Sequence, residues 1–199
     1  ENDIQKSGKK ASNIISILDN EYPEILRKTV GKPTILYIQG QMPKLPSVAI
    51  IGTREPTDHG KIITERISQY FSENGWSIVS GLALGCDTIA HLTAVKNKSH
   101  TTAVLAHGLD TISPKSNEKL SEEILSTGGT LLTEYEFGTK PKPYQYAQRD
   151  KIQAGLSQGV IMIQSNIKGG SLHASIAAIK YGRILAVPNS TDLDKKNKK

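Results

Sequence analysis

An uninterrupted apolar run that ends in a small, polar turn occupies residues 48–54: Val48-Ala49-Ile50-Ile51-Gly52-Thr53-Arg54. Consecutive apolar residues without alternation predict a strand that is buried on both faces, as in a parallel sheet. Residues 58–74 then show helical spacing before Gly75. The apolar face predicted for this helix consists of Ile62, Ile63, Ile67, Tyr70 and Phe71. A strand that passes through a polar turn into a helix indicates an α/β protein.

The same alternation continues toward the end of the chain. Further strands are predicted over residues 76–79, 102–106, 130–133, 160–164 and 184–187, and further helices over residues 87–98, 117–126 and 171–181. One more helix is predicted where a charged triplet enters an amphipathic segment: Arg149-Asp150-Lys151-Ile152-Gln153-Ala154-Gly155-Leu156-Ser157. Six strands linked by helices predict a parallel sheet with helices on both faces.

Residues 11–46 differ from this pattern, and we expect them to form a short N-terminal extension packed on the main sheet. Short strands are predicted over residues 14–18 and 35–38, around a helix that includes Tyr22-Pro23-Glu24. The segments 1–10 and 191–199 are rich in Lys, Asn and Asp, and such residues bury little apolar surface, so disordered tails are expected there. The α/β domain itself is assigned to residues 47–190.

The composition sets bounds on the class of protein. The chain of 199 residues carries a net charge of +6, of which residues 191–199 contribute +2 and residues 1–10 contribute +1. The mild positive charge that remains is compatible with a nucleic-acid partner. Cys86 is the only cysteine, so an internal disulfide is excluded and a cytoplasmic location is expected. No apolar stretch has the length of a membrane span, and we expect no membrane partner.

The motifs of several common catalytic sites are missing. The first strand is followed neither by Gly-x-Gly-x-x-Gly nor by a Gly-x4-Gly-Lys-Ser/Thr loop, which argues against a dinucleotide enzyme and against P-loop hydrolysis. No Cys/His spacing indicates a metal site, and no nucleophile elbow or pair of carboxylates stands out. We therefore expect no catalytic residue, no metal and no cofactor, but a site that holds phosphate without breaking bonds.

Small and polar residues follow the predicted strands, at the edge where open parallel sheets bind ligands. These turns are Gly52-Thr53-Arg54, Ser80-Gly81-Leu82-Ala83-Leu84-Gly85-Cys86-Asp87, His107-Gly108-Leu109-Asp110 and Lys168-Gly169-Gly170-Ser171. Glycines let a ligand approach the backbone closely, and free N–H groups at helix starts favour anions. Arg54 and Lys168 would add positive charge. Together the turns predict a site for a phosphate-bearing ligand.

Each of these features also has a purely structural explanation. Glycine-rich turns between strands and helices occur throughout α/β folds, Asp87 and Ser171 are suitable helix caps, and Cys86 suits a small buried position. For the histidines, the alternative to a functional role is a place in the core or on the surface: His91, His107 and His173.

Taken together, the motifs resemble those of the DNA-processing protein A family (DprA, also called Smf), whose core is a Rossmann-like domain. The resemblance extends from about Tyr22 to Pro188. It rests on several motifs in the family's order: Val48–Arg54, Ser80-Gly81-x-Ala83-x-Gly85-x-Asp87-x-x-Ala90-His91, Gly108-Leu109-Asp110, Gly129 with Thr133-Glu134, Arg149–Ser157, Lys168-Gly169-Gly170-Ser171-Leu172 and Ala186-Val187-Pro188. It implies a three-layer Rossmann-like fold over residues 47–190.

The resemblance also implies a function and a set of binding residues. The family binds single-stranded DNA in a basic pocket, dimerises, protects incoming DNA, and helps to load the RecA recombinase in natural transformation and recombination. By motif match, Arg54 with Gly52 and Thr53 would hold one backbone phosphate. Further matches are Ser80, Gly81 and Ala83 as donors of backbone N–H groups, and Arg149, Lys151, Lys168, Gly169, Gly170 and Ser171 as the other wall. Affinity in such a groove falls as salt rises.

Aromatic residues and departures from the family pattern leave alternatives open. Tyr144 and Tyr146 are candidates for stacking on bases, with a place in the core or on the surface as the alternative. The family usually has Arg-Asn-Arg at 149–151, so Asp150 places an anion beside the expected groove. Often the family also has arginine where this chain has Leu84. A small-nucleotide sensor or enzyme with the same pocket is therefore a second hypothesis, and an interaction scaffold is a third.

Overall fold

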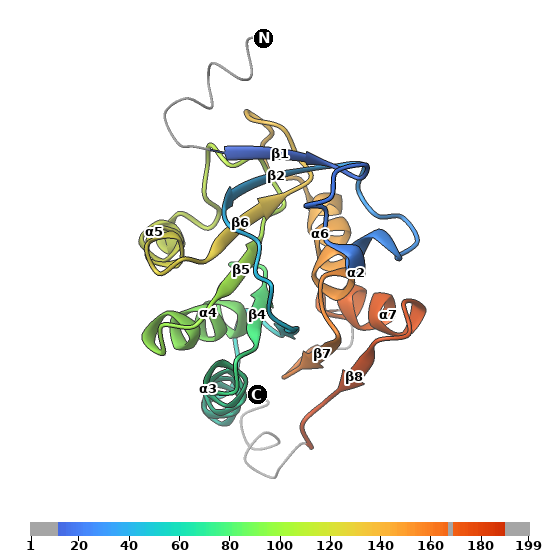
Figure 1. The fold of residues 1–199 in the computed structure, drawn as a ribbon. Coiled ribbons are helices and arrows are strands. Elements are labelled where there is room, and N and C mark those ends of the chain that lie inside the picture. Colours follow the sequence, from blue (N-terminus) through green and yellow to red (C-terminus); the bar gives the residue numbers. More distant parts are fainter. Residues whose placement is uncertain (1–11, 167–168, 190–199) are drawn as a thin grey trace.

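The computed structural model describes residues 12–166 and 169–189, and within them one sheet of eight strands runs through the molecule (Figure 1). Its order is β1-β2-β6-β5-β4-β3-β7-β8. The strands are β1 (Ser12–Ser16), β2 (Ile35–Gly40), β3 (Ser47–Ile51), β4 (Ser77–Ser80), β5 (Thr101–Val104), β6 (Thr130–Thr133), β7 (Gly159–Met162) and β8 (Ile184–Ala186). The tails expected over 1–10 and 191–199 lie outside the described residues.

Helices cover both faces of the sheet (Figure 1). One face carries α3 (Asp58–Glu73), α4 (Cys86–Lys96) and α5 (Glu118–Ser126), and the other carries α2 (Glu24–Arg27), α6 (Pro143–Gly155) and α7 (Leu172–Lys180). Strand β3 shows how the layers form, because Val48 and Ile50 pack toward α4 while Ala49 and Ile51 pack toward α6 and α7. The predicted three-layer architecture is confirmed.

The sheet is mixed, whereas the sequence predicted an entirely parallel one with an extension packed against it. Strands β3 to β8 pair in parallel, but β2 joins β6 antiparallel and β1 joins β2 antiparallel. Residues 12–16 and 35–40 thus lengthen one edge of the same sheet. The helix expected to include Tyr22-Pro23-Glu24 begins only at Glu24, and the Tyr22 hydroxyl instead donates to the Pro33 carbonyl at 2.7 Å.

Helix α3 buries a different face from the one that its apolar residues predict. Ile63, Ile67 and Phe71 pack on the core, but Ile62 and Tyr70 are exposed. Helix α3 packs against α4, and its buried positions are occupied by small residues spaced four apart, the first of which lies against Gln164: Gly60, Thr64, Ser68 and Ser72. Small side chains allow the two helices to approach closely, a preference that hydrophobicity alone does not reveal.

The strand order reverses between β3 and β7. From β3 the chain proceeds through β4, β5 and β6 on one side, whereas β7 and β8 lie on the other side of β3. In open α/β sheets such a reversal leaves a crevice beyond the carboxyl ends of the two central strands, and ligands bind there. A ligand site is therefore expected at the turns that follow Ile51 and Met162.

Candidate functional site

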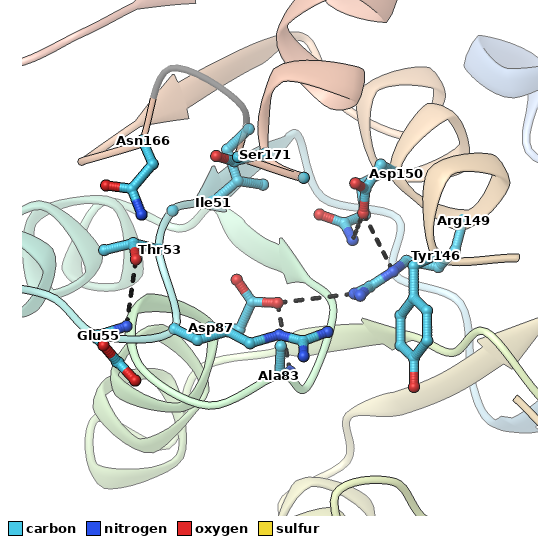
Figure 2. Close-up of a pocket in the computed structure, with 15 residues that line it drawn as sticks. Ile51, Thr53, Glu55, Ala83, Asp87, Tyr146, Arg149, Asp150, Asn166 and Ser171 are labelled. Atoms are coloured by element: carbon cyan, nitrogen blue, oxygen red, sulfur yellow. Dashed lines mark hydrogen bonds and ion pairs between the residues drawn. The ribbon is translucent and has the colours of Figure 1, made fainter. Parts of the chain in front are cut away.

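A pocket of about 400 Å³ lies at this reversal (Figure 2). Four segments line it: the turn after β3 with Ile51, Gly52, Thr53, Arg54 and Glu55; Ala83 and Asp87 at the start of α4; Tyr146, Arg149, Asp150 and Gln153 on α6; and Asn166, Gly169, Gly170 and Ser171 between β7 and α7. Volume and position are those of a site for a small molecule or for one or two nucleotides. The pocket brings together eight of the predicted binding residues: Gly52, Thr53, Arg54, Ala83, Arg149, Gly169, Gly170 and Ser171.

Arg54 supplies an exposed cation at the pocket. Its guanidinium carbon lies 5.4 Å from the centre of the Tyr146 ring, a cation–π distance. No described carboxylate forms a salt bridge with it. This turn packs closely on Gly85, the residue before α4. The φ of Gly85 is +77°, and a Cβ atom there would overlap the carbonyl groups of Thr53 and Arg54. A charged side chain is thus presented to ligand from a rigid backbone.

Arg149 is buried, with 4% of its surface exposed, and it links the two faces of the sheet. From α6 its Nη1 reaches Asp87 Oδ2 on α4 at 3.6 Å, and its Nε reaches Asp150 Oδ1 at 3.2 Å. Nη1 also donates to the Val104 carbonyl at the end of β5 at 3.4 Å. Two carboxylates therefore neutralise this guanidinium. Arg149 lines the pocket, as predicted, with its charge paired to these two carboxylates, and its contact with phosphate stays a prediction.

Gly81 is required for this arrangement. A Cβ atom on residue 81 would overlap Arg149 Nη1, so the guanidinium lies directly on the glycine backbone. Gln153, one helical turn after Arg149, completes the surround: with its amide oxygen facing the guanidinium, it accepts from Nη1 at 2.8 Å and from Nε at 3.2 Å. The glycine and the glutamine thus shape a closed site for one arginine.

Burial shifts the pKa values of the ionisable groups around Arg149, and for the two carboxyl groups the Arg149 charge offsets part of the shift. Burial raises the pKa of Asp150 to about 6, against the lowering influence of Arg149, with a further rise from the Asp87 charge. Burial also raises the pKa of Asp87, against Arg149. Burial, together with the Arg149 charge, lowers the pKa of His91 to about 3, so this histidine is neutral at physiological pH. His91 is a core residue whose Nδ1 lies 2.7 Å from Thr101 Oγ1.

The loop before α4 does not offer the N–H groups that the family match implied. Asp87 Oδ2 accepts from the backbone N–H of Gly81 at 3.1 Å and of Ala83 at 3.3 Å. Ser80 is fully buried, and its hydroxyl donates to the Ile50 carbonyl. These three residues therefore brace the loop from inside. Asp87, for which helix capping was the alternative, holds both the loop and Arg149.

Lys151 also lies elsewhere than predicted. Helix α6 begins at Pro143, so the charged triplet falls inside the helix and not at its entrance. Successive helical residues point about 100° apart, and burial of Arg149 and Asp150 turns Lys151 outward. Lys151 is exposed, does not line the pocket, and its ammonium donates to Gln148 Oε1 at 2.7 Å. Its contact with a bound strand stays a prediction.

The turn before α7 forms the remaining wall. The Ser171 hydroxyl donates to Ser165 Oγ at 2.8 Å, and a Cβ on Gly170 would meet no described atom within 4 Å, so the turn is open at this point. Lys168, predicted as a cation here, lies outside the described residues. Sequence reasoning missed Asn166 and Gln153 as lining residues. The spacing of four between Arg149 and Gln153 was the available signal for the second of these.

Two features are absent from the described residues, a membrane-spanning helix and a cluster of metal ligands. No helix within 12–166 and 169–189 is both long and apolar enough to cross a membrane. No group of three or more His, Cys, Asp or Glu side chains in that part of the chain could hold a metal ion. Cys86 is buried beneath Gly52, and burial raises the pKa of its thiol to about 11.

The fold and the pocket at the strand reversal define a Rossmann-like α/β domain with a pocket at the position where such sheets bind ligands. Within that class, a family model described as DNA recombination-mediator protein A matches residues 13–198. The chain belongs to this family.

Known relatives agree with the assignment. Protein Smf of Synechocystis is 36% identical over 197 residues, 96% of this chain and 49% of that protein. DNA processing protein DprA of Bacillus subtilis is 36% identical over 182 residues, 89% of this chain and 61% of that protein. The chain thus spans about half to three fifths of the length of these relatives.

Solved structures show the same fold. DNA processing protein A from Streptococcus pneumoniae superposes with a TM-score of 0.85 at 36% identity, over 96% of this chain and 68% of that one. The same protein from Helicobacter pylori, whose structure is described in terms of its single-stranded DNA binding mode, gives 0.82 at 33% identity, over 92% of this chain and 83% of that one. A molybdenum cofactor binding protein from Rippkaea orientalis, at 0.51 and 17% identity over 78% of this chain and 83% of that one, shares the fold alone.

Proposed function

We propose that this chain binds single-stranded DNA at the strand reversal, with a backbone phosphate at Arg54. The observation that carries the proposal is the exposed guanidinium of Arg54 at the mouth of a pocket that ends the central parallel strands. The Helicobacter pylori relative, which has the same fold, is described as binding single-stranded DNA. Arginine recognises phosphate oxygens through two parallel N–H donors, which suits a phosphodiester that passes the pocket.

The neighbouring residues fit a flexible polyanion. Gly170 leaves the turn before α7 open, so a sugar–phosphate chain could pass close to the backbone there, while Gly169 packs tightly against Ser165 and Asn166. Two tyrosines of α6 lie near this site: Tyr146, beside Arg54, is half-buried, and Tyr144 is exposed. Aromatic faces next to a cation stack bases without a strong sequence preference. The proposed role is to hold the strand, with no bond broken.

A salt titration tests the proposal. A fluorescent oligo-dT is titrated with protein between 50 and 200 mM salt. If three to five phosphates are neutralised, affinity falls roughly 10- to 100-fold over this range. Millimolar thymidine monophosphate should compete weakly. Thermal stabilisation by mononucleotides with indifference to oligo-dT would instead support the small-nucleotide sensor or enzyme, which the moderate size of the pocket and its carboxylates favour.

The finer functions of the family are proposed for this chain on the family assignment. These are protection of single-stranded DNA and assistance in recombinase loading during transformation or recombination, by a non-catalytic cytoplasmic protein with a RecA-type partner. A recombinase-loading assay on DNA coated with single-strand-binding protein tests them directly.

We also propose a homodimer, formed through the outer side of α7 and the free edge of β8. Four large apolar side chains are exposed there: Ile176 (64%), Ile179 (68%), Ile184 (75%) and Val187 (53%). Strand β8 ends the sheet and pairs only with β7 among the described strands. A second copy is the occupant proposed, because a sheet edge flanked by an apolar helix is complementary to itself under two-fold symmetry.

The variant Ile179→Asp is expected to convert the dimer into a monomer, since a carboxylate would be buried unpaired at the interface. Sedimentation velocity measures the change. Ile62→Asp is the matched control, because Ile62 is 49% exposed on α3, on the opposite face of the sheet. A wild-type protein that sediments as a monomer at all accessible concentrations would overturn this proposal.

A further inference from the structure

The pocket has two ends of opposite chemistry. Arg54 stands at the rim as an exposed cation, whereas Asp87 and Asp150 lie at the base, both buried. A phosphate is attracted to the first and repelled by the second. A strand held at Arg54 must therefore present something other than phosphate to the base of the pocket.

Among the described residues, the ion pairs and backbone hydrogen bonds of each buried carboxylate run through a single oxygen, Oδ2 of Asp87 and Oδ1 of Asp150. Asp87 Oδ2 is engaged by the N–H groups of Gly81 and Ala83 and by Arg149. Asp150 uses Oδ1 toward Arg149, and no described residue hydrogen-bonds its Oδ2. Figure 2 shows the Asp150 carboxylate on the pocket side of α6, between Ser171 and the Arg149 guanidinium. Asp150 Oδ2 is thus left as an acceptor on the α6 wall of the pocket.

A carboxylate oxygen requires a hydrogen-bond donor, and within a DNA strand only the bases have donors. The phosphodiester and the internal deoxyribose carry none. Cytosine presents an exocyclic amino group that pairs well with Asp or Glu, whereas thymine has a carbonyl at the same position, and its one donor, the ring N3–H, lies between two carbonyl groups that a carboxylate repels. Building on the proposed function, we propose that Asp150 accepts a hydrogen bond from the amino group of one base inserted into the pocket, so that the site prefers cytosine to thymine.

The surroundings suit such a base. The half-buried Tyr146 ring lies along the same wall as Asp150, one helical turn away, and the guanidinium carbons of Arg54 and Arg149 lie 5.4 Å and 5.9 Å from its centre. A base that enters the pocket would lie beside this aromatic and cationic wall. Burial strengthens a hydrogen bond to the carboxylate, and an unmatched carbonyl opposite it is correspondingly costly. Glu55 also lines the pocket, but it is exposed to water and discriminates less for that reason.

The charges around Asp150 fix the conditions of the test. Arg149 on its own helix, Asp87 on α4, His173 on α7 and Arg54 after β3 all act on it, and its pKa is raised to about 6. At pH 8 the carboxylate is ionised, and oligo-dC does not fold through protonated cytosine pairs. The experiment is therefore a titration of oligo-dC and oligo-dT of equal length at pH 8.

We expect wild-type protein to bind oligo-dC roughly three- to tenfold more tightly than oligo-dT, the range of one net hydrogen bond. Oligo-dC that carries N4,N4-dimethylcytosine, which has no amino hydrogen, should lose the advantage. Asp150→Asn should also lose it, because an amide presents its donor as readily as its acceptor. This substitution keeps the side-chain shape and removes the charge.

Asp58→Asn is the charge-matched control, since Asp58 is exposed at the start of α3 and its loss changes the net charge equally. It should raise affinity for both oligonucleotides slightly and leave their ratio unchanged. An equal ratio for wild type, Asp150→Asn and the dimethylated ligand overturns this inference while leaving DNA binding intact. Failure of wild type to bind either oligonucleotide overturns the proposed function and this inference together.

Discussion

Replacement of Arg54 by alanine is expected to weaken oligo-dT binding roughly 10- to 100-fold at moderate salt. The reason is that a charge-assisted hydrogen bond to phosphate contributes about 1.5–3 kcal/mol, and Arg54 is the exposed cation among the described residues that line the pocket. The slope of affinity against salt should also become shallower by about one phosphate contact. Fluorescence anisotropy at several salt concentrations measures both quantities.

Two matched variants separate this effect from a general loss of charge. Arg66→Ala removes the same group from an exposed position on α3, and Lys151→Ala removes a cation from the outer side of α6. Both should change affinity less than threefold. Arg54→Lys should fall between wild type and Arg54→Ala, because it keeps the charge but loses the paired donors. Equal losses for the Arg54 and Arg66 alanine variants would contradict a phosphate site at Arg54.

The layers of this fold could be predicted from the sequence because burial on both faces of parallel strands leaves a visible pattern. Val48–Ile51 and Thr130–Thr133 are continuous runs of residues suited to strands, and the structure buries every one of their residues. The antiparallel edge was less visible, since a short strand such as Ile35–Gly40 has the same pattern whether it packs on a sheet or joins it.

The site could be predicted only at the level of its loops. Arg54 and Gly170 belong to turns that any sheet of this kind brings to the ligand edge, so motif order sufficed to place them. The role of Arg149 could not be foreseen. Its partner Asp87 lies 62 positions away, and only the folded chain brings the two to 3.6 Å. The segment Arg149–Ser157 therefore contains one buried structural cation, Arg149, and one lysine that points outward, Lys151.

Replacement of Arg149 by methionine is expected to lower the free energy of unfolding by about 3–5 kcal/mol, the usual cost of removing one partner of a buried ion pair. Methionine preserves much of the volume, so the loss would come from Asp87 and Asp150, which would remain buried without their cation. Urea denaturation at pH 8, followed by circular dichroism, measures it.

The pH dependence of this loss distinguishes charge from packing. Without Arg149, the attraction that now opposes the raised pKa values of Asp87 and Asp150 disappears, so both pKa values should rise further. A carboxyl group with a raised pKa stabilises the folded state below its unfolded value near 4, and that contribution is lost as pH rises through the folded value. The deficit of Arg149→Met should therefore be smaller at pH 5 than at pH 8. A deficit under 1 kcal/mol, or one equal at both pH values, would indicate that the pairs contribute little.

Two further variants locate the cause within the network. Adding Asp87→Asn and Asp150→Asn to Arg149→Met removes the stranded charges and should recover a large part of the lost stability, because neutral amides are cheaper to bury than unpaired carboxylates. Gly81→Ala should lower the free energy of unfolding by a similar amount although it retains every charge. Its Cβ would occupy the place of Arg149 Nη1 and force the guanidinium away from Asp87. Gly170→Ala controls for the added methyl group, because no described atom lies within 4 Å of its Cβ position. If Gly81→Ala destabilises the protein no more than Gly170→Ala does, then the Arg149 side chain can adopt another position at little cost. In that case the ion pairs of Arg149 are not what holds α6 against α4.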